Sequence, residues 1–210
     1  LSFQSCPISY SPGRELWRVV AESLNISRLG RKRFIGDDDE RTPHVDLLYG
    51  AHGWVEHVDD HGIRFIYDAS KRVFNNKKVP EMQRISEWDC HGETIVDMYA
   101  GEVFPSKSKR RTGENAKIRK NFCCLGLGYY SLRFLVCCGA KQVISIDWSD
   151  DMCEALKRTA EANNVQDRML IIEGDSRRVT PCFVADRVFL GLVPSCRAHW
   201  LTACKALRPE

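Results

Sequence analysis

Three apolar runs that each reach an acidic residue constrain the fold of this chain most strongly. The acids are Asp97, Asp147 and Asp175, and each follows a run of strand-forming residues. Amphipathic segments at 129–138 and 150–162 lie between the runs. A fourth apolar run at 187–193 and a helical segment at 200–207 follow. Apolar strands that alternate with amphipathic helices predict an α/β fold, with a parallel sheet covered by helices on both faces.

The three acids predict a ligand site at one edge of this sheet. Ligands of such sheets bind outside the carboxyl ends of the strands, and all three acids lie there. Asp147 could accept hydrogen bonds from both hydroxyls of a ribose, and Asp175 could accept one from an adenine amino group. The pattern therefore indicates an adenosine-containing cofactor. The alternative is that Asp147 and Asp175 only cap helices or turns.

The first strand and its following helix are separated by an insert. Gly101 ends the strand segment, Gly128 opens the helix, and residues 102–126 lie between them. Joined, the two segments form a glycine turn, but they supply two glycines where a dinucleotide-binding motif needs three. S-adenosylmethionine is therefore favoured over NAD, because it carries adenosine without a pyrophosphate. A NAD-dependent oxidoreductase remains a remote alternative.

The insert differs from its flanks in charge. It carries seven basic and two acidic residues, so its removal changes the formal net charge of the chain from +3 to −2. The basicity therefore does not indicate that the whole chain binds nucleic acid. We interpret residues 102–126 as translated intron sequence or a gene-model error, with an RNA-binding loop and a nuclear localisation signal as alternatives.

The segment before the predicted sheet has a different pattern. A helix is expected at 15–24, strands at 45–49, 54–58 and 63–67, and a further helix after Pro80. A basic cluster at 29–33 is interpreted as a solvated charged surface. We divide the chain into a small α+β region at 1–90 and the sheet domain at 91–210, with the atypical insert at 102–126.

The sequence favours a cytoplasmic protein that binds neither membrane nor metal. No run approaches the roughly 20 apolar residues of a membrane helix. None of the ten cysteines forms a CxxC pair, which indicates reduced thiols rather than a zinc site. His52, His57 and His61 fall on predicted turns and strand faces, and we interpret them as surface histidines.

Several segments together resemble one family of tRNA-modifying enzymes. They are Asp97-Met98-Tyr99-Ala100-Gly101, Leu127-Gly128-Tyr129-Tyr130, Asp147-Trp148-Ser149, Glu173-Gly174-Asp175-Ser176-Arg177, the run from Ala185 to Ser195, and Gly53-Trp54-Val55-Glu56-His57-Val58. The chain is similar to the tRNA wybutosine-synthesising protein 2 family, which is related to the tRNA guanine-37 N1-methyltransferases. The resemblance covers most of the chain outside 102–126. The segments at 53–58 and 190–195 favour the wybutosine enzymes.

The resemblance implies a Rossmann-like class I S-adenosylmethionine-dependent transferase sheet, preceded by a small α+β domain and truncated at its C-terminal end. Members of the family transfer the 3-amino-3-carboxypropyl group of S-adenosylmethionine to 4-demethylwyosine at position 37 of phenylalanine tRNA. By motif, Asp147 would bind the ribose, Asp175 and Ser176 would face the adenine, and Arg84 would steady the target base or the tRNA. The turn residues expected at the cofactor are Asp97, Gly101 and Gly128.

The chain departs from the family at positions that bear on activity. Asn75 and Met82 stand where the family has a serine and a lysine that contact the cofactor, and Phe189 replaces an asparagine. Residues 102–126 also interrupt the turn that lies against the cofactor. We therefore expect an impaired isoform that binds S-adenosylmethionine weakly or not at all. A guanine-37 methyltransferase and a non-catalytic tRNA-binding relative are the alternative functions.

Overall fold

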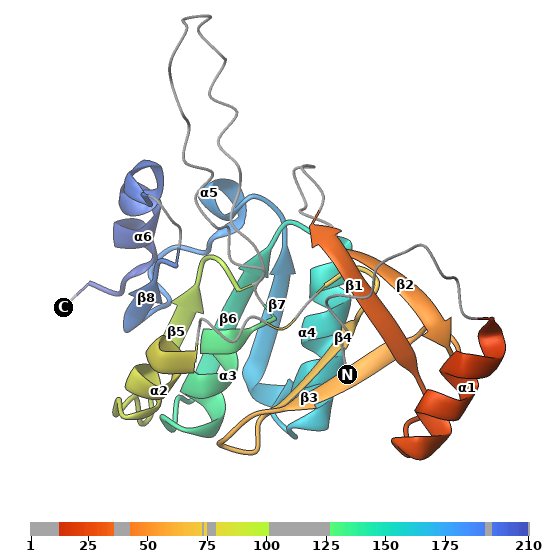
Figure 1. Ribbon diagram of the computed structural model, residues 1–210. Helices are drawn as coiled ribbons and strands as arrows, with labels where there is room; N and C mark the ends of the chain where they lie inside the picture. Colours follow the sequence, from red (N-terminus) through yellow and green to blue (C-terminus); the bar gives the residue numbers. More distant parts are fainter. Residues whose placement is uncertain are drawn as a thin grey trace, which may run out of the picture. The chain divides into compact units, whose positions relative to one another are not determined.

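The computed structural model describes residues 13–35, 43–72, 74, 79–100, 127–191 and 195–209 (Figure 1). Their contacts divide into two compact units. The smaller unit takes the described residues up to Val55 together with Tyr67 to Arg72, and the larger unit takes 56–66 and the described residues from Phe74 onward. The predicted functional boundary between residues 90 and 91 stays a prediction.

The larger unit is built on a parallel sheet, as the sequence predicts. Its strand order is β7-β6-β5-β8, and each neighbouring pair runs parallel. The bounds are β5 Thr94–Asp97, β6 Gln142–Asp147, β7 Met169–Glu173 and β8 Arg187–Phe189. From β5 the chain passes outward through β6 and β7, then returns to the other side of β5 as β8. The carboxyl end of β5 is therefore the topological switch point, where ligands of such sheets bind.

Helices cover both faces of this sheet. They are α2 Val79–Ser86, α3 Tyr129–Val136, α4 Asp150–Ala162, α5 Ser176–Val179 and α6 Trp200–Ala206, with short 3-10 turns η2 Gln166–Arg168 and η3 Arg197–His199. Successive strand residues point to opposite faces. Val96 and Ile144 accordingly pack with Ala203 of α6, whereas Asp97 points to the opposite face and bonds to α3.

Two side chains of α4 and its C-terminal end form hydrogen bonds with backbone groups of strand β4. Thr159 Oγ1 accepts the Ile66 N–H at 3.0 Å and donates to the Ile66 carbonyl at 3.2 Å. One turn later, Asn163 Oδ1 accepts the Arg64 N–H at 3.0 Å, and its Nδ2 donates to the Arg64 carbonyl at 2.6 Å. Among the described residues no further strand lies beside β4, so these bonds satisfy backbone groups of an edge strand and limit edge pairing with other chains.

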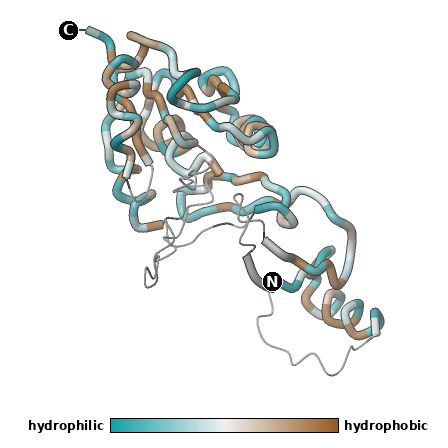
Figure 2. Tube along the Cα trace, turned by 90° about the horizontal axis from the view of Figure 1, so that it is seen from above, coloured by the Kyte–Doolittle hydropathy of each residue, from teal (hydrophilic) through white to brown (hydrophobic). Residues whose placement is uncertain are grey.

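The smaller unit contains helix α1 Arg14–Ser23 and the antiparallel strands β1 Leu29–Ile35 and β2 Pro43–Tyr49. Figure 2 shows apolar and hydrophilic residues alternating along α1. The predicted solvated cluster at 29–33 lies in β1, where Arg31 forms an ion pair with Asp46 of β2 at 2.7 Å. A cross-strand charge pair compensates the basic residue, so a charged run can form a strand.

Strands β3 Trp54–Val58 and β4 Arg64–Asp68 pair with each other, close to the bounds that the sequence predicts. The turn between them, residues 59–63, belongs to the larger unit, together with residues 56–58 of β3 and 64–66 of β4. None of the helices in the described part of the chain has the length and apolar character needed to cross a membrane.

Candidate cofactor site

The interrupted glycine turn closes in space. The N–H of Gly128 donates to the Ala100 carbonyl at 2.9 Å, and the Ala100 N–H donates to the Ile146 carbonyl at 3.1 Å. Ala100 therefore lies beside Gly128 at the start of α3, which confirms that the two segments form one strand-turn-helix unit. Gly101 and residues 102–126 lie outside the described residues.

Gly128 occupies a position that favours glycine for two reasons. Its φ is +74°, in the left-handed region that side chains with a Cβ disfavour. A Cβ at this position would also lie 2.6 Å from Cδ2 of Leu156, so α4 packs directly against the turn. The glycine thus allows both the turn and the close approach of α4.

Asp97 is fully buried beneath this turn. Its Oδ1 accepts the Tyr99 N–H at 3.1 Å, and its Oδ2 accepts the Ser131 hydroxyl at 2.7 Å. Ser131 is in turn 3.0 Å from the Ser145 hydroxyl of β6. The carboxylate therefore ties the end of β5 to the first turn of α3, which is a positioning role. Contact of Asp97 with a cofactor stays a prediction.

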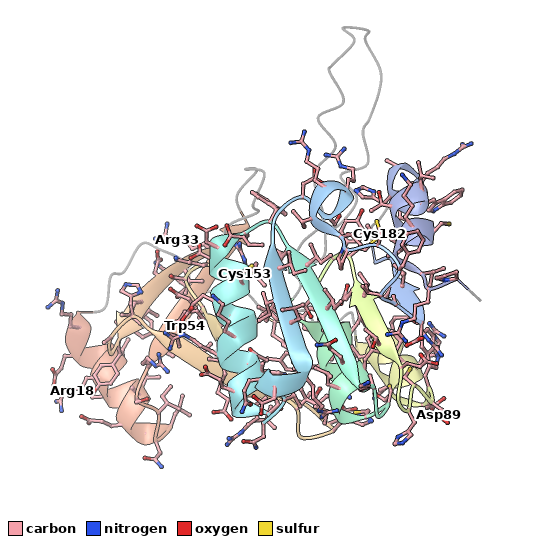
Figure 3. The ribbon with its side chains drawn as sticks, turned by 180° about the vertical axis from the view of Figure 1, so that it is seen from behind. Arg18, Arg33, Trp54, Asp89, Cys153 and Cys182 are labelled. Atoms are coloured by element: carbon pink, nitrogen blue, oxygen red, sulfur yellow. The ribbon has the colours of Figure 1, made fainter. Side chains whose placement is uncertain are left out.

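Asp147 lies buried at the end of β6. Its Oδ1 accepts the Ser149 N–H at 2.8 Å, while its backbone carbonyl accepts the Gly174 N–H at 2.8 Å. Ser149 is the residue before α4, as predicted, but its own side chain makes no capping bond. Cys153, labelled on α4 in Figure 3, contacts the same carbonyl at 3.8 Å. Burial raises the pKa of its thiol to about 12, so it remains protonated.

Asp175 and Ser176 lie at the end of β7 and the start of α5. Asp175 caps the helix by accepting the Arg177 N–H at 3.0 Å, and the Arg177 guanidinium binds both carboxylate oxygens at 2.5–3.1 Å. Hydrogen bonding to Arg177 lowers the pKa of Asp175, with burial acting in the opposite direction. Ser176 is buried. Asp147 and Asp175 therefore do form the capping bonds that the alternative interpretation expects. Capping is compatible with ligand binding, because an ionised carboxylate offers about four lone-pair sites.

A second pair of acids lies at the same edge. Glu173 is the last residue of β7 and Asp150 lies in the first turn of α4, and the neighbouring Asp150 carboxyl raises the pKa of Glu173. The edge of the sheet therefore carries acceptor groups on β6, β7 and α4.

Tyr99 and His199 were missed by the sequence analysis. The Tyr99 hydroxyl lies beside Ser176 without reaching hydrogen-bond geometry, and its ring centroid is 5.1 Å from that of His199. Burial raises the pKa of Tyr99, and it lowers the pKa of His199 together with the charge of Arg177. Tyr99 is two residues beyond Asp97, so its position near the edge could have been inferred. His199 is 100 residues away, and no pattern connects the two.

Arg84 lies apart from these acids. It projects from α2 with its side chain 53% exposed, and it binds Glu81 of the same helix through two hydrogen bonds of 2.8 and 2.7 Å. Among the described residues it forms no ion pair with the acids at the strand ends. Met82 beside it is fully buried, so the position where the family has a lysine faces the core here.

The acidic turn between β3 and β4 bears on the prediction of no metal. Asp59, Asp60 and His61 each offer one potential ligand atom, and these atoms lie within 4.8 Å of one another. The predicted surface histidine His61 thus has two acidic neighbours. Arg133 already binds both carboxylates, and His61 Nδ1 lies 3.1 Å from Asp60. The turn is therefore compensated by an internal cation, and the absence of a metal stays a prediction.

The sequence of this chain is similar to that of one known family of tRNA-modifying proteins. The family model described as the TRM5/TYW2 methyltransferase domain matches residues 106–210. The human protein named tRNA wybutosine-synthesizing protein 2 homolog is 38% identical over 198 residues, which cover 94% of this chain and 38% of that protein. The Arabidopsis thaliana tRNA wybutosine-synthesizing protein 2/3/4 is 37% identical over 93% of this chain and 17% of its own length. This chain thus spans well under half of these relatives.

Solved structures show the same fold. The Pyrococcus horikoshii TYW2 in complex with MeSAdo matches with a TM-score of 0.65 and 25% identity, over 93% of this chain and 60% of that chain. The complex of aTrm5 and tRNALeu matches with a TM-score of 0.67 and 19% identity, over 99% of this chain and 54% of that chain. The sheet described above is accordingly that of a class I S-adenosylmethionine-dependent methyltransferase.

Proposed function

Because the chain belongs to the TRM5/TYW2 methyltransferase domain family, we propose that it is a tRNA-modifying transferase of wybutosine biosynthesis. Its cofactor site lies at the carboxyl ends of β5, β6 and β7, and residues 102–126 impair S-adenosylmethionine binding there. It transfers the 3-amino-3-carboxypropyl group to 4-demethylwyosine at position 37 of phenylalanine tRNA. The observation that carries this proposal is the closure of the glycine turn between Ala100 and Gly128 at the topological switch point.

The names of the relatives support the reaction class. Vertebrate and plant proteins that are 35–38% identical are named tRNA wybutosine-synthesizing proteins. The Pyrococcus horikoshii TYW2 was solved with MeSAdo, and the Methanocaldococcus jannaschii TYW2, 22% identical, was solved with AdoMet. A cytoplasmic location and the choice of phenylalanine tRNA are part of the proposal.

The residues at the strand ends fit an adenosine group. A ribose needs acceptors for two hydroxyls, and Asp147 places a carboxylate at the end of β6. An adenine needs an acceptor for its amino group, and Asp175 is the corresponding acid after β7. The buried hydroxyl of Tyr99 beside Ser176 offers a further polar contact. We propose that Asp147, Asp175 and Ser176 contact the cofactor, with Asp97 and Gly128 shaping the turn and Gly101 completing it.

The contribution of the chain to catalysis is orientation. S-adenosylmethionine supplies a sulfonium whose three attached carbons are all electrophilic. Which carbon meets the nucleophile depends on the pose that the protein holds, because reaction requires the atoms to be close and aligned. Asp97 fixes the first turn of α3 against β5, and the Gly174–Asp147 backbone bond fixes the ends of β6 and β7. We propose that Arg84 steadies the target base or the tRNA.

The test is a labelling experiment. The chain, as it stands and with residues 102–126 deleted, is incubated with cognate tRNA and with cofactor labelled either in the methyl group or in the carboxyl group. The carboxyl label should enter the RNA and methylthioadenosine should be released, with the higher yield from the deletion variant. Entry of the methyl label in its place would show a guanine-37 N1-methyltransferase.

A non-catalytic tRNA-binding relative is the second candidate function. Buried Met82 favours it, because no cation is available at that position for the carboxylate of the cofactor. Such a protein would bind tRNA while releasing no methylthioadenosine from either labelled cofactor.

A further inference from the structure

Trp88, in the larger unit, has two arginine guanidiniums over its ring. The guanidinium carbon of Arg84 is 4.9 Å from the ring centroid of Trp88, and that of Arg187 is 5.3 Å from it. Trp88 is half-buried, with the ring of Phe134 at 6.1 Å. Figure 3 labels the next residue, Asp89, near the start of β5. Cation–π contacts thus hold the guanidiniums against the indole.

Both guanidiniums are fixed by carboxylates. Arg84 donates to Glu81 through Nε at 2.8 Å and Nη2 at 2.7 Å, and Arg187 donates to Glu93 through two bonds of 2.9 Å. Two-point bonding sets the orientation of the guanidinium plane as well as its position. Because each cation is paired, the cluster has little net charge with which to attract phosphate. The planar faces of the guanidiniums and the indole are therefore the feature that a ligand would recognise.

The cluster is connected to the candidate cofactor site through aromatic side chains. The ring of Phe134, which lies 6.1 Å from that of Trp88, is 5.6 Å from the ring of Phe189. Tyr130 belongs to the first turn of α3, two residues after Gly128. Its ring centroid is 4.7 Å from that of Phe189, which is in register with Asp97. Planar groups therefore extend from the edge of the sheet along α3 to Trp88.

We propose that Arg84, held on Trp88, forms a stacking platform for an unpaired nucleobase of the RNA, at a nucleotide next to the one that is modified. This inference rests on the proposed function, since it names how the same substrate is held. Proteins bind single-stranded RNA by stacking bases on aromatic rings and on arginine planes. Arg84 is the exposed member, with 53% of its side chain accessible, while Trp88 is a positioning residue that sets its plane.

The experiment measures binding of an anticodon stem–loop RNA of phenylalanine tRNA by the full chain. Trp88→Leu keeps an apolar side chain but removes the ring, and Arg84→Lys keeps the charge but removes the plane. Each should weaken binding by roughly five- to tenfold, the effect of one lost base stack. Trp88→Phe keeps a ring and should stay within about twofold of the wild type. The slope of affinity against salt concentration should not change, because no phosphate contact is removed.

A matched control variant and a modified RNA distinguish base stacking on Arg84 from other effects on RNA binding. Arg158 is also an exposed helical arginine paired with a glutamate, Glu154 at 2.7 Å, and Arg158→Lys should leave RNA affinity unchanged. With abasic sites at the nucleotides flanking position 37, wild type and Trp88→Leu should bind equally. Urea unfolding of each variant monitors its fold.

Two results overturn the inference in distinguishable ways. If Trp88→Leu binds the intact stem–loop as tightly as the wild type, the platform is wrong and the proposed function is untouched. If the chain binds no stem–loop RNA and releases no methylthioadenosine, either as it stands or with residues 102–126 deleted, the proposed function and the platform are both wrong.

Discussion

At the scale of single residues, Gly128 is the position where a methyl group should matter most. Gly128→Ala places an alanine at φ +74° and its Cβ 2.6 Å from Leu156. The left-handed backbone alone costs about 1–2 kcal/mol, and displacement of Leu156 adds to this. We expect a clear loss in the free energy of unfolding, measured by urea titration.

Gly62 provides the matched control for this substitution. Its φ is +75°, but a Cβ there would meet nothing within 4 Å. Gly62→Ala therefore measures backbone strain without a clash. Equal destabilisation by Gly62→Ala and Gly128→Ala would show that the packing of α4 against the turn has no energetic weight.

Asp175 should make the stability of the chain depend on pH. Asp175→Ala removes the cap of α5 and the partner of Arg177, and loss of a cap costs about 1 kcal/mol at pH 7. The pKa of Asp175 is lowered in the folded state, so its contribution is present above the ordinary carboxyl pKa. It is lost as pH falls through the lowered value.

The measurement is the free energy of unfolding of wild type and Asp175→Ala at pH 7 and near pH 2. The difference between them should shrink at the lower pH. Asp167→Ala removes an exposed acid from η2 and serves as the control. A difference that is constant across the pH range would contradict an ionised, paired Asp175.

At the scale of elements, α3 is anchored to the β3–β4 turn by a buried ion pair. Arg133 of α3 is fully buried, and its partner Asp59 is 4% exposed. Asp59 also accepts the backbone N–H groups of His61 and Ile63, each at 2.9 Å. Arg133→Met would leave this carboxylate buried without its cation. Breaking such a pair typically costs 3–5 kcal/mol.

A double-mutant cycle checks this prediction. Asp59→Asn keeps an acceptor for the two N–H groups while removing the charge. Combined with Arg133→Met, it should recover much of the lost free energy of unfolding, because no uncompensated charge remains. Additive effects of the two substitutions would show that the ion pair does not couple α3 to the turn.

At the scale of the whole molecule, we expect residues 102–126 to weaken cofactor binding without preventing the chain from folding. A loop of 25 residues adds only a modest closure entropy, and the turn closes between Ala100 and Gly128. The backbone of the same turn has to lie against the cofactor. We therefore expect calorimetry to detect weak or no S-adenosylmethionine binding by the full chain, and tighter binding after deletion of 102–126.

Thermal unfolding of both chains is the control for this deletion, since both should melt cooperatively. Equal micromolar affinities in the two chains would contradict the expectation. That result would show that the insert leaves the binding turn intact.

The alternation of apolar and amphipathic segments in the sequence was sufficient to determine the parallel sheet, its helices and the acids at its edge. Strand and helix periodicities are local properties, and acids that end parallel strands must share an edge. The short helix α5 and strand β1 were missed, because four residues carry no periodicity and the charges of β1 are compensated by Asp46 from another strand.

Only the tertiary structure decided which groups meet across long stretches of chain. The closure of the glycine turn between Ala100 and Gly128, the contact of Tyr99 with His199, and the cation–π contact of Arg187 with Trp88 all join distant positions. Such contacts depend on packing and strand order, which periodicity does not encode. Local pattern therefore determined the elements of this protein, and their packing determined which residues form its site.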